Sequence, residues 1–263
     1  MSARNSDDPQ GSRSDDDRRQ VIDVQAESVQ TRELVVRRNT LPKTEDAPLP
    51  TPPPAFAVGI ATPEQLDAFR ELRTRLLAMA AAIGRTHFIT LVVGATPGSG
   101  ASFVARNLAV AFTLQDRQFA ILVDCNMRHP MQHRALGTPP AEEGGLFDFL
   151  DHPYTAGIER LVRPTPVPNL HLIPAGKPPV TPREYFSSQA MKMVIAGLRQ
   201  APCYAFLDGP PVKGSPDARI LSESADFIVL VAGYGHDTVA GINQAASLFD
   251  PNKFAGVVFN ERS

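Results

Sequence analysis

The most constraining feature of this sequence is a series of short aliphatic runs without polar alternation. They span residues 88–93, 119–123, 170–173, 205–207, 227–231 and 256–259. Such runs are typical of parallel strands that are buried on both faces of a sheet. Segments with helical periodicity separate most of them, and one precedes them, at residues 63–82, 102–114, 183–198, 218–224 and 239–249. The alternation predicts an α/β fold with a doubly wound, mostly parallel sheet, whose site lies at the carboxyl ends of the strands.

The N-terminal part of the chain has a different composition. Residues 1–19 are dominated by Ser, Asp and Arg, and residues 41–56 contain six prolines. A stretch of this kind has little apolar surface to bury, and its prolines exclude it from helices and central strands. We therefore expect residues 1–57 to be a disordered, proline-rich tail and residues 58–263 to form one domain. The aliphatic islets at 21–24 and 33–36 are interpreted as incidental, with docking peptides as the alternative.

Composition excludes several classes of function. The 263 residues carry a net charge of -2 and show no basic stripe, so no nucleic-acid partner is expected. The two cysteines, Cys125 and Cys203, are too few for a disulfide framework and indicate a reducing, cytoplasmic compartment. No apolar run is long enough to cross a bilayer, and the N-terminus is polar and unlike a signal peptide. Attachment to a membrane would therefore depend on a partner.

A glycine-rich turn follows the first aliphatic run. Residues 94–102 read Gly-Ala-Thr-Pro-Gly-Ser-Gly-Ala-Ser, and a predicted helix comes next. Gly98 and Gly100 fall where a phosphate loop (P-loop) brings its backbone close to phosphate, and Ser102 falls where a hydroxyl binds magnesium. The helix start offers unpaired amides to an anion. The candidate nucleotide-binding residues in this loop are Gly98, Ser99, Gly100, Ala101, Ser102 and Phe103.

Position 101 departs from the P-loop pattern, because alanine stands where lysine is expected. That lysine contacts the β- and γ-phosphates and offsets charge as the phosphoryl group is transferred. The loss of one charge-assisted contact costs about 1.5–3 kcal/mol of binding, and the transition state loses more. Taken alone, the segment could also be a tight strand-helix turn without a ligand.

Aspartates stand at the ends of two further aliphatic runs. Asp124 follows the run 119–123, and Asp208 follows the run 205–207. A carboxylate at the carboxyl end of a parallel strand, beside a P-loop, is placed to hold Mg²⁺ or its water. For either residue alone, a strand-end cap is the alternative. Together with Ser102 they are the candidate magnesium ligands.

These motifs resemble the bacterial tyrosine kinase (BY-kinase) family, the cytoplasmic partners of polysaccharide co-polymerases. The family's Walker A′ strand ends with Asp-x-Asp-x-Arg. Asp124 and Arg128 match this pattern, but Asn126 replaces the second aspartate. The resemblance covers the chain from about residue 60 onward and implies a P-loop, BY-kinase-like domain over residues 58–263.

The end of the chain adds two further points of resemblance. The family's Walker B strand ends with Asp-x-Pro-Pro, which Asp208, Pro210 and Pro211 match in full. The closing run resembles the family's last strand, whose asparagine usually lies near the adenine. The resemblance therefore adds Asn260 to the nucleotide-binding candidates.

A third motif lies in the first predicted helix. The family carries Glu-x-x-Arg-x-x-Arg there and uses it in subunit contacts of a ring. This chain has Asp67, Arg70 and Arg73 at that spacing, with Asp in place of Glu. The resemblance implies an oligomerisation site. From the residues alone, a solvated helix face with i,i+3 pairs is the alternative.

The departures from the family's pattern decide which function the resemblance implies. The P-loop lysine, the second Walker A′ aspartate and the family's C-terminal tyrosine cluster are all missing, and the four tyrosines are scattered. We therefore expect a degenerate kinase, or pseudokinase, that is not an enzyme. It would support exopolysaccharide biosynthesis and export. ATP or ADP with Mg²⁺ would bind weakly, if at all.

The resemblance also implies partners and a location. The expected partner is the cytoplasmic end of an inner-membrane polysaccharide co-polymerase, together with identical or related subunits in an oligomer. The protein would be cytoplasmic and peripheral at the inner membrane through that partner.

Two alternatives remain open from the sequence. One is an active tyrosine autokinase or ATPase that is completed by a cation from a partner. The other, more distant, is a positioning ATPase of the ParA/MinD type, which carries an additional signature lysine early in the P-loop. Thr96 stands at that position here.

Overall fold

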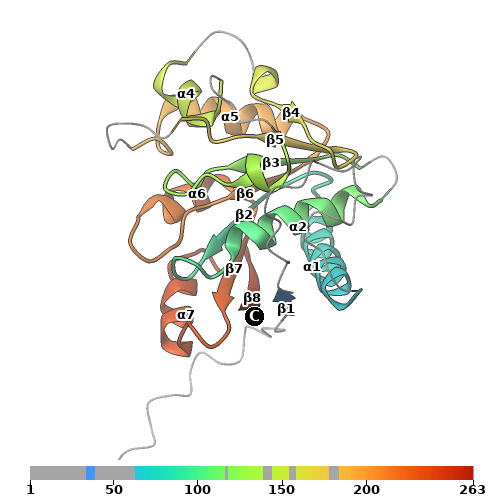
Figure 1. Cartoon of the computed structure of the whole chain (residues 1–263), viewed down its shortest axis with the longest axis vertical. Coiled ribbons are helices and arrows are strands. Elements are labelled where there is room, and N and C mark those ends of the chain that lie inside the picture. The colour runs from blue at the N-terminus through green and yellow to red at the C-terminus, as the bar shows by residue number, and fades with distance from the viewer. Residues whose placement is uncertain are drawn as a thin grey trace, which may run out of the picture. The chain divides into compact units, whose positions relative to one another are not determined.

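A computed structural model describes residues 34–38, 63–115, 118–138, 144–153, 158–177 and 184–262 (Figure 1). The strands are β1 (Leu34–Arg38), β2 (Ile89–Gly94), β3 (Ala120–Asp124), β4 (Arg163–Pro164), β5 (Leu170–Ile173), β6 (Tyr204–Asp208), β7 (Phe227–Gly233) and β8 (Phe254–Arg262). The helices are α1 (Pro63–Ala82), α2 (Ala101–Thr113), α3 (Gln132–Ala135), α4 (Leu146–Asp151), the 3₁₀ turn η2 (Ile158–Arg160), α5 (Gln189–Gln200), α6 (Asp217–Ser224) and α7 (Val239–Ala246).

The strands form one sheet in the order β1-β8-β7-β2-β6-β3-β5-β4, which runs from the bottom of Figure 1 to the top. All neighbouring strands are parallel except β4 and β5. From β2 the chain crosses to β3 on one side of β2, whereas the later strand β7 pairs with β2 on its other side. The strand order therefore reverses at β2. In doubly wound sheets the ligand site lies at the carboxyl ends of the strands, beside such a reversal. The predicted fold class is confirmed.

The sheet has a hydrophobic core on each face. Side chains of β2 alternate between the two cores: Leu91 packs with residues of α4, α5, α6 and α7, and Val92 packs with residues of α1 and α2. Figure 1 shows α6 and α7 on one side of the sheet and α1 on the other. Burial on both faces explains why the strands read as continuous aliphatic runs. Among the described helices, none is both long and apolar enough to cross a membrane.

The predicted boundaries agree with the structure within a few residues, apart from two helices. The predicted helix 183–198 starts too early, because α5 begins at Gln189. Ser188 is its N-cap, and the Ser188 hydroxyl accepts a hydrogen bond from the Met191 amide at 3.1 Å. The predicted helix 239–249 ends earlier, at Ala246, and the chain then passes through Pro251 into β8. The short helices α3 and α4 were not predicted.

The structure describes one strand within the segment that we expect to be a tail. This strand, β1, pairs in parallel with β8 from Leu34 opposite Val258 to Arg38 opposite Arg262. A β-branched segment can pair with the otherwise free edge of β8, and this compensates for the ordering of a short strand. The other residues of this stretch lie outside the described part of the chain.

Candidate functional site

The phosphate loop connects β2 to α2 and depends on its glycines. Gly98 and Gly100 have φ angles of 84° and 93°, in the left-handed region that favours glycine. A Cβ atom at Gly100 would overlap the side-chain amide of Asn260, and one at Gly94 would overlap the Ser99 hydroxyl. The backbone therefore has the strand, turn and helix geometry that the sequence predicted.

Asn260, on β8, lies against this loop. Its side chain is fully buried, and Nδ2 donates a hydrogen bond to the Ser99 carbonyl at 3.0 Å. The structure shows this residue packed against the phosphate loop, and its expected place near the adenine remains a prediction. Two buried atoms here, Ser99 Oγ and Asn260 Oδ1, have no hydrogen-bond partner among the described residues.

The start of α2 offers amides to an anion but no charge. Ala101 and Ser102 open the helix, so their N–H groups have no intrahelical acceptor. The Ala101 methyl is half-buried and packs against the core between α1 and α2. Phe103 belongs to that core, and its amide already donates to the Gly100 carbonyl at 3.0 Å. The Phe103 side chain therefore packs in the core, and its amide forms a hydrogen bond at the start of α2.

The two predicted carboxylates meet at the carboxyl edge of the sheet. Asp124 and Asp208 are opposite one another in the pairing of β3 with β6, and both side chains are buried. Asp124 accepts hydrogen bonds from the amides of Asn126 (3.2 Å) and Gln132 (3.0 Å). Asp208 Oδ1 has no partner in the described part of the chain.

Gln132, the first residue of α3, was not singled out from the sequence. It is fully buried, and its Nε2 donates to Asp208 Oδ2 at 2.7 Å and to the Ser102 carbonyl at 2.8 Å. Because its backbone amide also binds Asp124, this residue joins all three nucleotide motifs. Nothing in the local pattern indicated it, since α3 is too short to show periodicity.

Burial raises the pKa of both carboxyl groups. The pKa of Asp124 rises from 3.8 to about 8, first because the side chain is buried and second because Asp208 is nearby. Burial raises the pKa of Asp208 to about 6, while hydrogen bonds from Gln132 and Ser102, and the charge of Arg106, act in the opposite direction. The metal-free pair therefore holds a proton at neutral pH.

This protonation predicts a pH dependence of stability. Because the folded-state pKa of Asp124 lies above its usual 3.8, the native protein binds more protons than the unfolded chain up to about pH 8. The free energy of unfolding of the metal-free protein should therefore fall as pH rises from about 5 to 8. Urea unfolding at constant ionic strength measures the slope, which should be shallower in Asp124→Asn. Equal slopes in the two proteins would contradict the assignment.

The oxygen atoms at this edge fit a magnesium ion. Ser102, Asp124 and Asp208 supply the hard oxygen ligands that Mg²⁺ prefers, and the buried Asp208 Oδ1 still lacks a partner. Mg²⁺ would displace the proton held by the pair, so metal binding should strengthen with pH.

The other motif residues lie around this edge in different roles. The Asn126 side chain accepts a hydrogen bond from the His129 amide at 3.4 Å and so caps a turn. Arg128 is exposed, and its Nη2 lies 3.4 Å from the Gly214 carbonyl. Thr96, where positioning ATPases have their signature lysine, donates to Asp237 at 2.5 Å.

Pro210 and Pro211 follow Asp208 after Gly209 and lead the chain back along the phosphate loop. The next residue, Val212, donates its amide to the Gly94 carbonyl at 2.8 Å. The loop after β6 is thereby fixed beside the start of the P-loop.

The predicted oligomerisation residues on α1 are not equivalent. Arg70 and Asp67 form an exposed i,i+3 ion pair at 3.2 Å, as the solvated-face alternative describes. Arg73 instead donates to the Ala111 carbonyl of α2 at 2.6 Å within the same domain. Arg73 thus makes a contact within its own domain, while Asp67 and Arg70 are exposed.

Comparisons with known proteins found similarity to bacterial tyrosine kinases. No family model matches the chain. Tyrosine-protein kinase wzc of Salmonella typhimurium is 33% identical over 211 residues, which cover 78% of this chain and 28% of that protein. The solved BceF tyrosine kinase domain is 28% identical, with a TM-score of 0.67, and the match covers 79% of this chain and 82% of that domain.

A positioning ATPase shares the fold alone. The cell division ATPase MinD of Pyrococcus furiosus superposes with a TM-score of 0.51 at 19% identity, covering 65% of this chain and 70% of that protein. The chain spans 28% of the length of its wzc relative, and so corresponds to one part of that protein.

Proposed function

Because the chain belongs to the bacterial tyrosine kinase family, we propose that it is a pseudokinase that binds a nucleotide without transferring its phosphate. It would support exopolysaccharide biosynthesis and export through a membrane co-polymerase. The observation that carries the proposal is Ala101. The loop around it keeps its glycine geometry, while the position of the phosphate-binding lysine holds a methyl group packed on the core.

Different groups of the chain bind the phosphates and the metal ion. Loop amides at the start of α2 bind phosphate, and the helix dipole favours the anion. Ser102, Asp124 and Asp208 would hold Mg²⁺, which offsets phosphate charge when bound. Gln132 donates hydrogen bonds to both carboxylates and to the Ser102 carbonyl, and so holds these groups in place.

Phosphate transfer would fail for two separate reasons. The lysine that offsets charge on the transferred phosphoryl group is absent, and Asn126 supplies a turn cap where the family has a carboxylate. The tyrosines offer little to compensate. Tyr185 and Tyr204 are buried, and among the described residues only Tyr234 exposes its ring substantially, at 63%.

We expect the purified protein to gain no phosphate on incubation with ATP and Mg²⁺. Intact-mass spectrometry before and after incubation measures this, and the wzc kinase domain under the same conditions is the positive control. A mass increase of one phosphate that maps to a tyrosine would overturn the pseudokinase proposal.

We further propose that the protein acts by association, at the cytoplasmic end of an inner-membrane co-polymerase and with identical or related subunits. The exposed Asp67–Arg70 pair on α1 supports this, because charges at an interface rim set register and specificity.

Substitutions of the two arginines of α1 should have different effects. Arg70→Glu should lower the sedimentation coefficient of the assembly and leave the free energy of unfolding within about 0.5 kcal/mol. Arg73→Ala should instead destabilise the domain by about 1 kcal/mol, because it removes the bond to Ala111. Lys192→Glu, on the exposed face of α5, is the matched control. Unchanged sedimentation of Arg70→Glu, or a wild type that is monomeric at every concentration, would contradict the association.

A further inference from the structure

The loop after β6 brings a lysine to the edge of the phosphate loop. The Val212 amide donates to the Gly94 carbonyl at 2.8 Å, and the Lys213 amide donates to the Ala95 carbonyl at 3.2 Å. Two successive backbone bonds therefore fix Lys213 beside the first residues of the P-loop. The chain then turns away at Gly214, whose φ of 97° is in the left-handed region.

The Lys213 ammonium is not committed to another group. The residue is exposed, and within the described part of the chain its side chain makes neither a hydrogen bond nor an ion pair. A lysine side chain is a flexible four-carbon stem that ends in three donors, so it can reach an anion from a neighbouring segment.

Two arginines near the loop each already have a contact within the domain. Arg106, one turn into α2, donates to Gln132 Oε1 at 3.4 Å, lies over the Phe103 ring, and lowers the pKa of Asp208. The Arg128 guanidinium lies against the Gly214 carbonyl.

The loop itself indicates a missing ligand. Ser99 Oγ and Asp208 Oδ1 are buried polar atoms without a hydrogen-bond partner in the described residues, and both lie at the loop or at the end of the strand beside it. The helix start adds amides that have no intrahelical acceptor. Together these groups fit a polyphosphate with its cation, and such a ligand needs a positive charge that position 101 does not supply.

We propose that Lys213 replaces the lost P-loop lysine and binds the terminal phosphates of a nucleoside di- or triphosphate. This rests on the proposed nucleotide binding, and it moves the phosphate-binding charge from the helix start to the loop after β6. Lys213 is assigned a role in binding only. Asn126 is unchanged, so phosphate transfer is not restored.

Calorimetric titration with ADP and with the analogue AMP-PNP, in Mg²⁺ at fixed ionic strength, tests the assignment. Lys213→Ala should weaken the binding of both nucleotides roughly ten- to hundredfold. Lys213→Arg should retain most of the affinity, because the charge is kept. Ala101→Lys introduced into Lys213→Ala should restore binding, since it returns the charge to the loop. A purely structural role of Lys213 would not give this rescue.

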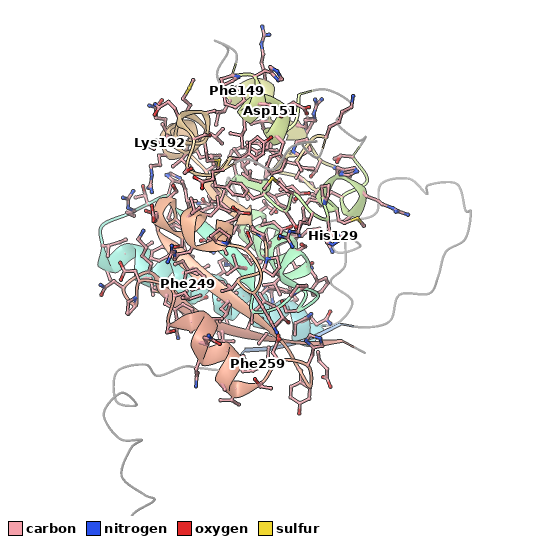
Figure 2. All side chains as sticks on the ribbon, turned by 90° about the vertical axis from the view of Figure 1, so that its left-hand side faces the viewer. His129, Phe149, Asp151, Lys192, Phe249 and Phe259 are labelled. Carbon is pink, nitrogen blue, oxygen red and sulfur yellow. The ribbon has the colours of Figure 1, made fainter. Side chains whose placement is uncertain are left out.

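Lys192→Ala is the matched control. Lys192 is an exposed lysine on α5, and Figure 2 shows it well separated from His129, the neighbour of Arg128 in the chain. Its substitution should leave binding unchanged. Equal affinities of wild type and Lys213→Ala, with clear binding by both, would overturn the assignment of Lys213 alone. No binding by wild type would overturn this assignment together with the proposed nucleotide binding, whereas transfer of phosphate to a tyrosine would overturn the pseudokinase proposal without bearing on Lys213.

Discussion

Ala101→Lys should tighten the binding of ADP with Mg²⁺ about tenfold in the wild-type background and up to about a hundredfold in Lys213→Ala. One charge-assisted contact is worth about 1.5–3 kcal/mol, which corresponds to this range of affinity. The loop is already shaped for phosphate, because Gly98 and Gly100 hold the left-handed conformations that it needs. The new side chain keeps the Cβ of alanine and adds only an extension. The gain is smaller when Lys213 is present, since two cations then share one polyphosphate.

Ala101→Met is the control for this prediction. It adds a side chain of similar length without charge, so it should not tighten binding. Replacing alanine by lysine within a helix costs only a few tenths of a kcal/mol, so the domain should remain folded. Calorimetry on Ala101→Lys and Ala101→Met, in the wild-type and Lys213→Ala backgrounds, measures the effect. If Ala101→Lys bound no more tightly than wild type in either background, the loop would not lack a cation.

The sequence was sufficient to predict all strands of the sheet except β1 and β4, because the predicted strands are buried and their hydrophobic runs are uninterrupted. The phosphate loop and both aspartates were predicted for the same reason. Glycines with special backbone angles and carboxylates at strand ends leave local signals, and the parallel topology brings them to one edge. The coarse site was therefore predictable from short segments.

The missed features depend on contacts between distant segments. Gln132 is 76 residues from Asp208 in the chain, and no local pattern connects them. Asn260 hydrogen-bonds to Ser99 across 161 residues of the chain, and no local pattern indicated this contact. Arg73 was grouped with Arg70 by spacing, but α2 packs on one side of α1 and its Ala111 carbonyl binds only Arg73. The position of Lys213 beside the P-loop gave no signal either, because this residue belongs to no motif.

The fate of bound ATP tests the central claim most directly. With protein in excess over γ-labelled ATP and well above its Kd for ATP, and with Mg²⁺ present, nearly all nucleotide is bound, and loss of ATP reports the chemical step alone. Kinases turn over at about 1–100 s⁻¹. The absent lysine and the absent carboxylate each remove roughly a hundredfold or more. We therefore expect a first-order rate below about 0.01 s⁻¹, with the label retained in ATP on the timescale of normal kinase turnover.

Ala101→Lys should bind ATP more tightly, and its rate of ATP loss should remain below the kinase range, because Asn126 is unchanged. Loss of ATP at about 1–100 s⁻¹ by the wild type, or transfer of the label to the protein, would contradict the claim that this family member binds nucleotide without using it.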